Sequence, residues 1–144
     1  MCSQAQASLC FTDHDPKGGY ISSPLTKYQP SITWPSHSRK LYTMFIIDED
    51  NPYPEPWNTQ SPYIHWMVVN IPGSRLWDGR EVLPYLWPSP EADSPPHRFK
   101  CNIYSQAGTL PLLYPKRSSF PLDKFVEDST LTLVESIPFT VGYR

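Results

Sequence analysis

The sequence predicts a mainly β protein with many loops and one or two short helices. Eighteen prolines, nine tyrosines and five tryptophans occur among 144 residues, and the long runs of Ala, Leu, Glu and Lys that favour helices are missing. Short apolar runs at residues 41–47 and 64–71 are bounded by Asp, Asn and Pro, which is typical of buried strands. Periodicity alone would also allow buried helices, but the short runs and the flanking prolines favour strands.

The elements before and between these two strands are predicted from turn signals. Residues 7–22 contain two short apolar pieces around DHDPKGG, which predicts a hairpin. Residues 31–34 predict a strand with Ile32 and Trp34 on one face. Residues 83–96 contain five prolines and predict a stiff, extended loop that could hold Tyr85 or Trp87 over a pocket.

The C-terminal part of the chain adds strands and a helix. Residues 97–105 alternate most clearly, with His97, Phe99, Cys101 and Ile103 on the inward face of a half-buried antiparallel strand. Residues 119–128 predict the helix, residues 131–135 a strand, and residues 138–144 a short end piece. Because 144 residues suffice for one core and no repeat is visible, we expect a single domain over residues 1–144.

Composition disfavours several classes of protein. A net charge of −2 and a pI near 6.0 give no reason to expect nucleic acid as a partner. No apolar run has the length of a membrane span, and the N-terminus lacks the regions of a secretory signal. We therefore expect a cytoplasmic protein with at most peripheral membrane contact, and Cys2, Cys10 and Cys101 as free thiols.

Polar side chains occur where the predicted strands end. Asp48 and Asp50 are two residues apart, so they should project the same way as the first strand ends. His65 begins the second strand, in register with Met67, Val69 and Ile71, and His97 begins another. Such residues could form the floor of a small polar pocket. Equally, the carboxylates could cap turns and the histidines could simply bond to their neighbours.

Three ordered motifs resemble those of the phosphatidylethanolamine-binding proteins, which include the Raf kinase inhibitor proteins and plant flowering regulators. They are KLYTMFIIDEDNP, YIHWMVVNIPG and PPHRFKCNIYSQ. The family pattern is D-x-D-x-P, a histidine three residues before V-V-N, and H-R-[YF]. The resemblance extends from about residue 8 to about residue 128.

This resemblance implies a large central antiparallel sheet packed on a smaller sheet, with a small cavity at one end. In the family the cavity binds phosphate, phosphoethanolamine or carboxylate ligands without a cofactor, through histidine N–H groups. It also implies a cis peptide between Asn51 and Pro52. By motif, the ligand-binding residues would be Asp48, Asp50, Pro52, His65, His97 and Phe99.

The chain departs from the family pattern in three places. WPSPEADSPP replaces a glycine-rich loop, so prolines stand in place of flexible backbone donors and Glu91 and Asp93 add negative charge. Phe99 stands where a tyrosine is common, and the chain ends soon after Pro138, so we expect a more open cavity.

Three functions remain open. The first is a non-enzymatic protein that binds an anionic or phosphoryl head group and inhibits or scaffolds a kinase or protease. The second is a metal-dependent hydrolase using His65, His97 and Asp48, which ranks lower because no serine or cysteine nucleophile has a placed base. The third is a pure protein-interaction module with a vestigial cavity.

Overall fold

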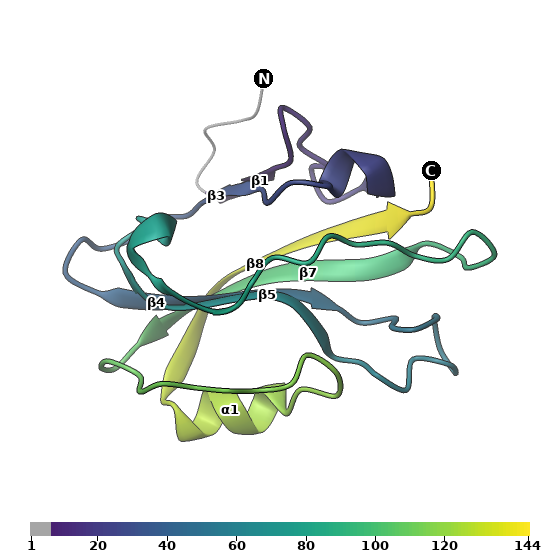
Figure 1. Ribbon diagram of the computed structural model, residues 1–144. Coiled ribbons are helices and arrows are strands. Elements are labelled where there is room, and N and C mark those ends of the chain that lie inside the picture. The colour runs from purple at the N-terminus through teal and green to yellow at the C-terminus, as the bar shows by residue number, and fades with distance from the viewer. Residues whose placement is uncertain (1–6) are drawn as a thin grey trace.

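The computed structural model describes residues 7–144, which form three layers (Figure 1). A six-stranded sheet with strand order β2-β8-β7-β4-β5-β6 lies in the middle, the two-stranded sheet β1-β3 covers one face, and α1 covers the other. The strands are β1 (Ser8–Cys10), β2 (Tyr20–Ser22), β3 (Ser31–Thr33), β4 (Leu41–Asp48), β5 (Tyr63–Pro72), β6 (Arg80–Leu83), β7 (His97–Gln106) and β8 (Leu131–Gly142). The helices are α1 (Leu122–Asp128) and the 3₁₀ turns η1 (Ser23–Thr26) and η2 (Leu76–Asp78). This architecture confirms the predicted fold class.

The middle sheet is buried on both faces, which explains the continuous apolar runs of β4 and β5. One face packs under β1 and β3 and the other packs on α1 and the loop before it. The first cluster includes Phe11, Ile32, Trp34, Met44, Ile46, Trp66 and Phe99. The second includes Phe45, Ile47, Met67, Val69, Phe120 and Phe125. Since β4 and β5 have no solvent face, apolar residues fill most of their length, and the polar residues between their ends are Thr43, His65 and Asn70.

Two predictions about strand pairing are wrong. Residues 7–22 do not form a hairpin, because β1 pairs antiparallel with β3 whereas β2 pairs parallel with β8. The pieces predicted at 131–135 and 138–144 form the one long strand β8, which keeps pairing with β7 through Pro138. Helix α1 begins later than predicted, at Leu122.

Two irregularities in the pairing of β4 with β5 change which side chains share a face. One lies between Ile46 and Ile47, opposite His65, and the other lies near Asn70, whose φ is 56°. An extra residue on one strand shifts the later side chains to the opposite face. Met67 and Val69 therefore belong to the helix-side cluster and Ile71 to the other one, so the register predicted for β5 is wrong.

The cysteines differ in state. Cys101 is free and fully buried in the core, and burial raises the pKa of its thiol. Cys10 is disulfide-bonded, so the expectation of a free thiol is wrong there, and Cys2 lies outside the described residues. Between residues 7 and 144, no helix is long and apolar enough to span a membrane.

Candidate functional site

The predicted polar residues converge at one end of the middle sheet. Asp48, the last residue of β4, pairs with Phe99 of β7 on one side and with Tyr63 of β5 on the other. His65 and His97 lie near the starts of β5 and β7. Because both neighbours of β4 run antiparallel to it, the end of β4 meets both of these starts.

Asp48 is the hydrogen-bonding centre of this site. Its side chain is almost completely buried, and its Oδ1 accepts from the backbone N–H of Asp50 at 2.8 Å. Its Oδ2 accepts from Asn51 Nδ2 at 3.3 Å and lies 2.8 Å from His97 Nδ1. The carboxylate therefore fixes the orientation of the His97 ring.

Both ring nitrogens of His97 are engaged. Its Nδ1 donates to Asp48, and its Nε2 lies 3.1 Å from the hydroxyl oxygen of Ser94. The Ser94 hydroxyl also lies 2.8 Å from the Pro95 carbonyl oxygen, to which it can only donate. Ser94, His97 and Asp48 therefore lie in a continuous array, in which the hydrogen of the Ser94 hydroxyl is directed to Pro95 and not to His97.

His65 is held differently. Its Nδ1 lies 2.6 Å from the carbonyl oxygen of Leu86, which can only accept, so Nδ1 carries the hydrogen. Its Nε2 lies 3.9 Å from Asp48 Oδ2 and has no hydrogen-bond partner among the described residues. Burial lowers the pKa of His65 to about 4, outweighing the Leu86 carbonyl and Asp48, which raise it. At neutral pH the ring is therefore neutral and Nε2 is a buried acceptor.

These side chains line a cavity of about 220 Å³. Asp48, Pro52, His65 and His97 all lie in its wall. Phe99 lies outside the lining, with its ring centroid 5.1 Å from that of His65 and 6.5 Å from that of His97. The remaining lining residues are Asn51, Tyr53, Gln60, Tyr63, Leu86, Trp87, Ser89, Pro90 and Glu91.

Asp50 is buried but does not line this cavity. Its Oδ2 accepts from the backbone N and from Nε of Arg98 at 2.6 and 3.0 Å, and its Oδ1 accepts from Nη2 at 2.9 Å. Burial alone would raise the pKa of Asp50, but the hydrogen bonds and charge of Arg98 lower it overall. Because β4 ends at Asp48, strand alternation no longer governs Asp50, and the two carboxylates have different partners.

The proline-rich loop after β6 forms the other wall of the cavity. The sequence analysis predicted that this loop is stiff and could hold Tyr85 or Trp87 over a pocket. Trp87 lines the cavity, whereas the hydroxyl of Tyr85 donates to Thr26 and its ring packs on Trp66. Leu86 acts through its backbone, donating to the His65 carbonyl and accepting from the His65 ring. Sequence reasoning missed the contribution of Leu86 because a backbone carbonyl leaves no residue-type signal. The peptide between Asn51 and Pro52 is cis, which confirms that prediction.

The geometry does not favour a metal centre. Within residues 7–144, no group of three or more His, Cys, Asp or Glu side chains is placed to hold a metal ion. In the set His65, His97 and Asp48 considered for a metal-dependent hydrolase, Nδ1 of His97 is hydrogen-bonded to Asp48 and Nδ1 of His65 is hydrogen-bonded to Leu86. Neither of these two nitrogens therefore has a free lone pair for a metal.

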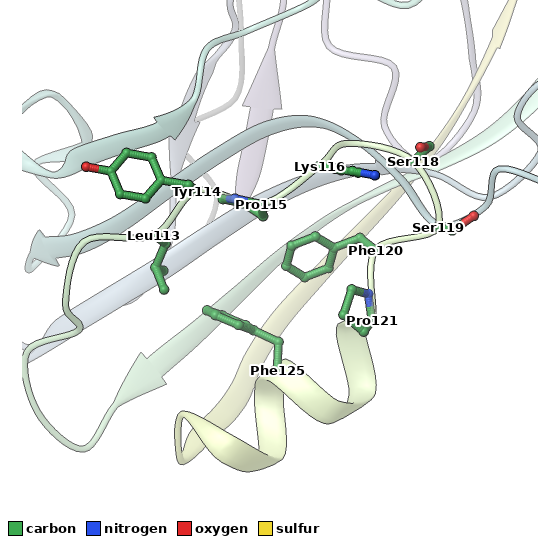
Figure 2. Close-up of a pocket in the computed structure, with 9 residues that line it drawn as sticks. All are labelled: Leu113, Tyr114, Pro115, Lys116, Ser118, Ser119, Phe120, Pro121 and Phe125. Atoms are coloured by element: carbon green, nitrogen blue, oxygen red, sulfur yellow. The ribbon is translucent and has the colours of Figure 1, made fainter.

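A larger pocket of about 450 Å³ lies on the helix side of the sheet, near the start of α1. Figure 2 shows the rings of Phe120 and Phe125 side by side in its lining, where they pack edge to face with centroids 5.6 Å apart. Lys116 is the one charged residue in its lining, which lies wholly within the described chain. Since it contains no cluster of titratable groups, the histidine cavity is the better candidate site.

Relatives and solved structures resemble this chain over much of its length. A putative odorant-binding protein A5 of Drosophila melanogaster is 33% identical over 58% of this chain, and a 26 kDa secreted antigen of Toxocara canis is 29% identical over 67%. The chain spans only 40% and 37% of these relatives. A carboxypeptidase Y inhibitor, solved in complex with its cognate proteinase, superposes with a TM-score of 0.81 at 14% identity, covering 96% of this chain and 83% of that one.

The family match covers most of the sequence. The sequence profile described as "Phosphatidylethanolamine-binding protein" matches residues 11–136. This range includes all three motifs and every strand of the middle sheet in whole or in part. The chain therefore belongs to the phosphatidylethanolamine-binding protein family.

Proposed function

We propose that this protein is a non-enzymatic binding protein that takes the polar head of a small ligand into the histidine cavity. The observation that carries the proposal is the unpartnered Nε2 of His65, a buried polar atom of a side chain that lines the cavity. Leaving such an atom unpaired costs roughly 1–3 kcal/mol. A ligand that donates a hydrogen bond to this atom recovers the cost. A histidine with a purely structural role would instead be expected to have both ring nitrogens paired within the protein.

A histidine NMR titration with phosphoethanolamine tests this function. We expect saturable shifts of the His65 and His97 ring signals in the wild type, with the exposed His14 and His37 unaffected. His65→Phe keeps an aromatic ring between its neighbours but removes Nε2, so we expect it to weaken binding at least tenfold. His14→Gln is the matched control and should bind like the wild type. Absence of any response at both cavity rings would refute the proposal.

We extend the proposal to inhibition of a proteinase rather than a kinase. The similar carboxypeptidase Y inhibitor supports this choice, although at 14% identity it shows only a shared fold. An inhibition assay with carboxypeptidase Y, using the wild type and His65→Phe, tests it. Inhibition that survives this substitution would favour an interaction surface elsewhere and a vestigial cavity.

Acyl transfer is the second candidate, favoured by the array of Ser94, His97 and Asp48 with separations of 3.1 and 2.8 Å. Two features rank it lower. Ser94 does not line the cavity, and Pro95 has no backbone N–H to stabilise an oxyanion. Labelling with a fluorophosphonate separates the two candidates. If the protein is a hydrolase, the reagent should modify Ser94, and the modification should be lost when His97 is replaced. We expect no modification of Ser94.

We also propose that residues 1–144 fold as one domain. We further propose that the protein is located in an oxidising compartment, rather than in the cytoplasm as first expected. The disulfide at Cys10 and the similar secreted antigen support this location, because disulfides persist in oxidising environments. Alkylation before and after reduction of freshly isolated protein tests it. Cys10 should react only after reduction, and Cys101 only after unfolding.

A further inference from the structure

We propose that a groove beside β3 binds an extended, arginine-containing segment of a partner protein, which adds a third strand to the two-stranded sheet. The groove has a volume of about 560 Å³ and lies on the face of the middle sheet opposite α1 (Figure 1). None of the residues that line it lines the histidine cavity. Binding in this groove is therefore independent of the proposed function.

The free edge of β3 forms one wall of this groove. All three residues of β3, Ser31, Ile32 and Thr33, line it. Because successive side chains of a strand point to opposite faces, contact with all three indicates that the groove runs along the backbone edge of the strand. β1 pairs with the other edge of β3, and no residue of β1 lines the groove.

This edge has backbone groups that can pair with a new strand. A two-stranded ladder uses the backbone groups of β3 on one side only. Within residues 7–144, the N–H and C=O groups on the other side of residues 31–33 have no hydrogen-bond partner. Pro30 and Pro35 have no N–H, so they limit the free edge to a few residues. The partner is therefore a short extended segment that binds by strand addition.

The remaining walls supply apolar surface for the side chains of that segment. Val68 of β5 and Leu76 of η2 line the groove. Trp77 also lines it, and 79% of its surface is exposed, so a large apolar ring face is available to a partner. A segment paired with β3 presents every second side chain to this surface.

The charge of the groove selects arginine among the possible side chains. Glu81 is the one charged residue in the lining, and the whole lining lies within the described chain. Its Oε2 accepts from Trp66 Nε1 at 2.8 Å, which holds the carboxylate at the groove. The ion pairs that lysine and arginine form in residues 7–144 involve other carboxylates, so Glu81 has no cationic partner there. A guanidinium can pair with this carboxylate and can also stack on the Trp77 ring.

Fluorescence anisotropy with three end-blocked, dye-labelled hexapeptides tests the inference. In the first peptide, threonine alternates with arginine, valine and arginine in turn. The second has glutamate in place of arginine, and the third is the first with N-methylated backbone amides. We expect the first to bind saturably and the others at least tenfold more weakly, because they lose the charge match and the backbone donors respectively. Failure of the first peptide to bind, or equal binding by either of the others, would overturn the inference.

Two pairs of variants locate the bound peptide. Trp77→Ala and Glu81→Gln should each weaken the first peptide severalfold. Trp57→Ala and Glu127→Gln are the matched controls, since Trp57 is 67% exposed, Glu127 is exposed on α1, and neither lines the groove. Both controls should bind the peptide like the wild type. Equal effects within either pair would contradict the inference.

Hydrogen exchange and competition add two further readouts. The first peptide should slow the exchange of amide hydrogens in residues 31–33, as strand pairing requires. Saturating phosphoethanolamine should not displace it, because the groove and the histidine cavity share no lining residue. Displacement would assign the peptide to the histidine cavity and overturn the inference.

Sedimentation velocity distinguishes a partner protein from a second copy of this chain. We expect the protein alone to sediment as a monomer. A dimer that is dissociated by Trp77→Ala or Glu81→Gln would show that a second copy occupies the groove. That result would overturn the assignment of the groove to a partner protein.

Discussion

Lowering the pH should destabilise this protein through His65 by an amount that the structure sets. Burial lowers the pKa of this side chain in the folded state from 6.5 to about 4. The Leu86 carbonyl and Asp48 raise the pKa, whereas the charges of Arg117 and His97 lower it further. The unfolded chain therefore binds a proton first as the pH falls. The stability contributed by the neutral ring is complete above about pH 6.5 and is lost progressively down to about pH 4.

The magnitude follows from the size of the shift. A shift of one pKa unit corresponds to about 1.4 kcal/mol, so the full loss is about 3 kcal/mol, of which about 2 kcal/mol is lost between pH 8 and pH 5. Urea denaturation at both pH values, monitored by tryptophan fluorescence, measures this loss of unfolding free energy. In His65→Phe the decrease in unfolding free energy from pH 8 to pH 5 should be smaller by about 2 kcal/mol, whereas in His14→Gln it should match the wild type. An unchanged pH dependence in His65→Phe would refute the reasoning.

Two further predictions concern stability at neutral pH. Asp50→Asn should lower the unfolding free energy by about 1–3 kcal/mol, because it weakens the hydrogen bonds that the buried Asp50 side chain accepts from Arg98. Asp78→Asn, in an ion pair that is exposed on both sides, should cost less than about 1 kcal/mol, and equal losses in urea denaturation would contradict this. Gly79→Ala should cost about 1–3 kcal/mol, because its Cβ would lie 2.7 Å from two buried β5 side chains. Gly108→Ala, which meets nothing within 4 Å, should change the unfolding free energy by at most about 0.5 kcal/mol, and thermal denaturation compares the two.

The strands that carry the site could be predicted because their sequence signals are local. β4 and β5 are buried on both faces, so each appears as a continuous apolar run that ends at Asp or Pro. β7 keeps its alternation at its start, where His97 and Phe99 face inward and Arg98 is exposed. Antiparallel pairing then brings these strand ends together, so Asp48 and the two histidines could be predicted to meet.

Pairing between distant segments could not be predicted in the same way. The sequence DHDPKGG signals a reversal of the chain, but a turn does not specify which strand pairs with which. β1 reaches β3 and β2 reaches β8, about 120 residues away in the sequence. The irregularity opposite His65 was hidden for a related reason, because a bulge depends on the partner strand as well as on its own residues.

The chemical character of the cavity depends on one loop more than on the motif residues. The motifs supply a carboxylate and two histidines, and the resemblance implies that the histidine N–H groups donate to an anion. The loop at residues 84–96 reverses this for His65, because the Leu86 carbonyl takes its only hydrogen and leaves an acceptor. The same loop adds the carboxylate of Glu91 to the lining. Glu91 belongs to WPSPEADSPP, the segment that departs from the family pattern, whereas Leu86 directly precedes it, so both the shared part and the altered part of this chain contribute to the wall of the cavity.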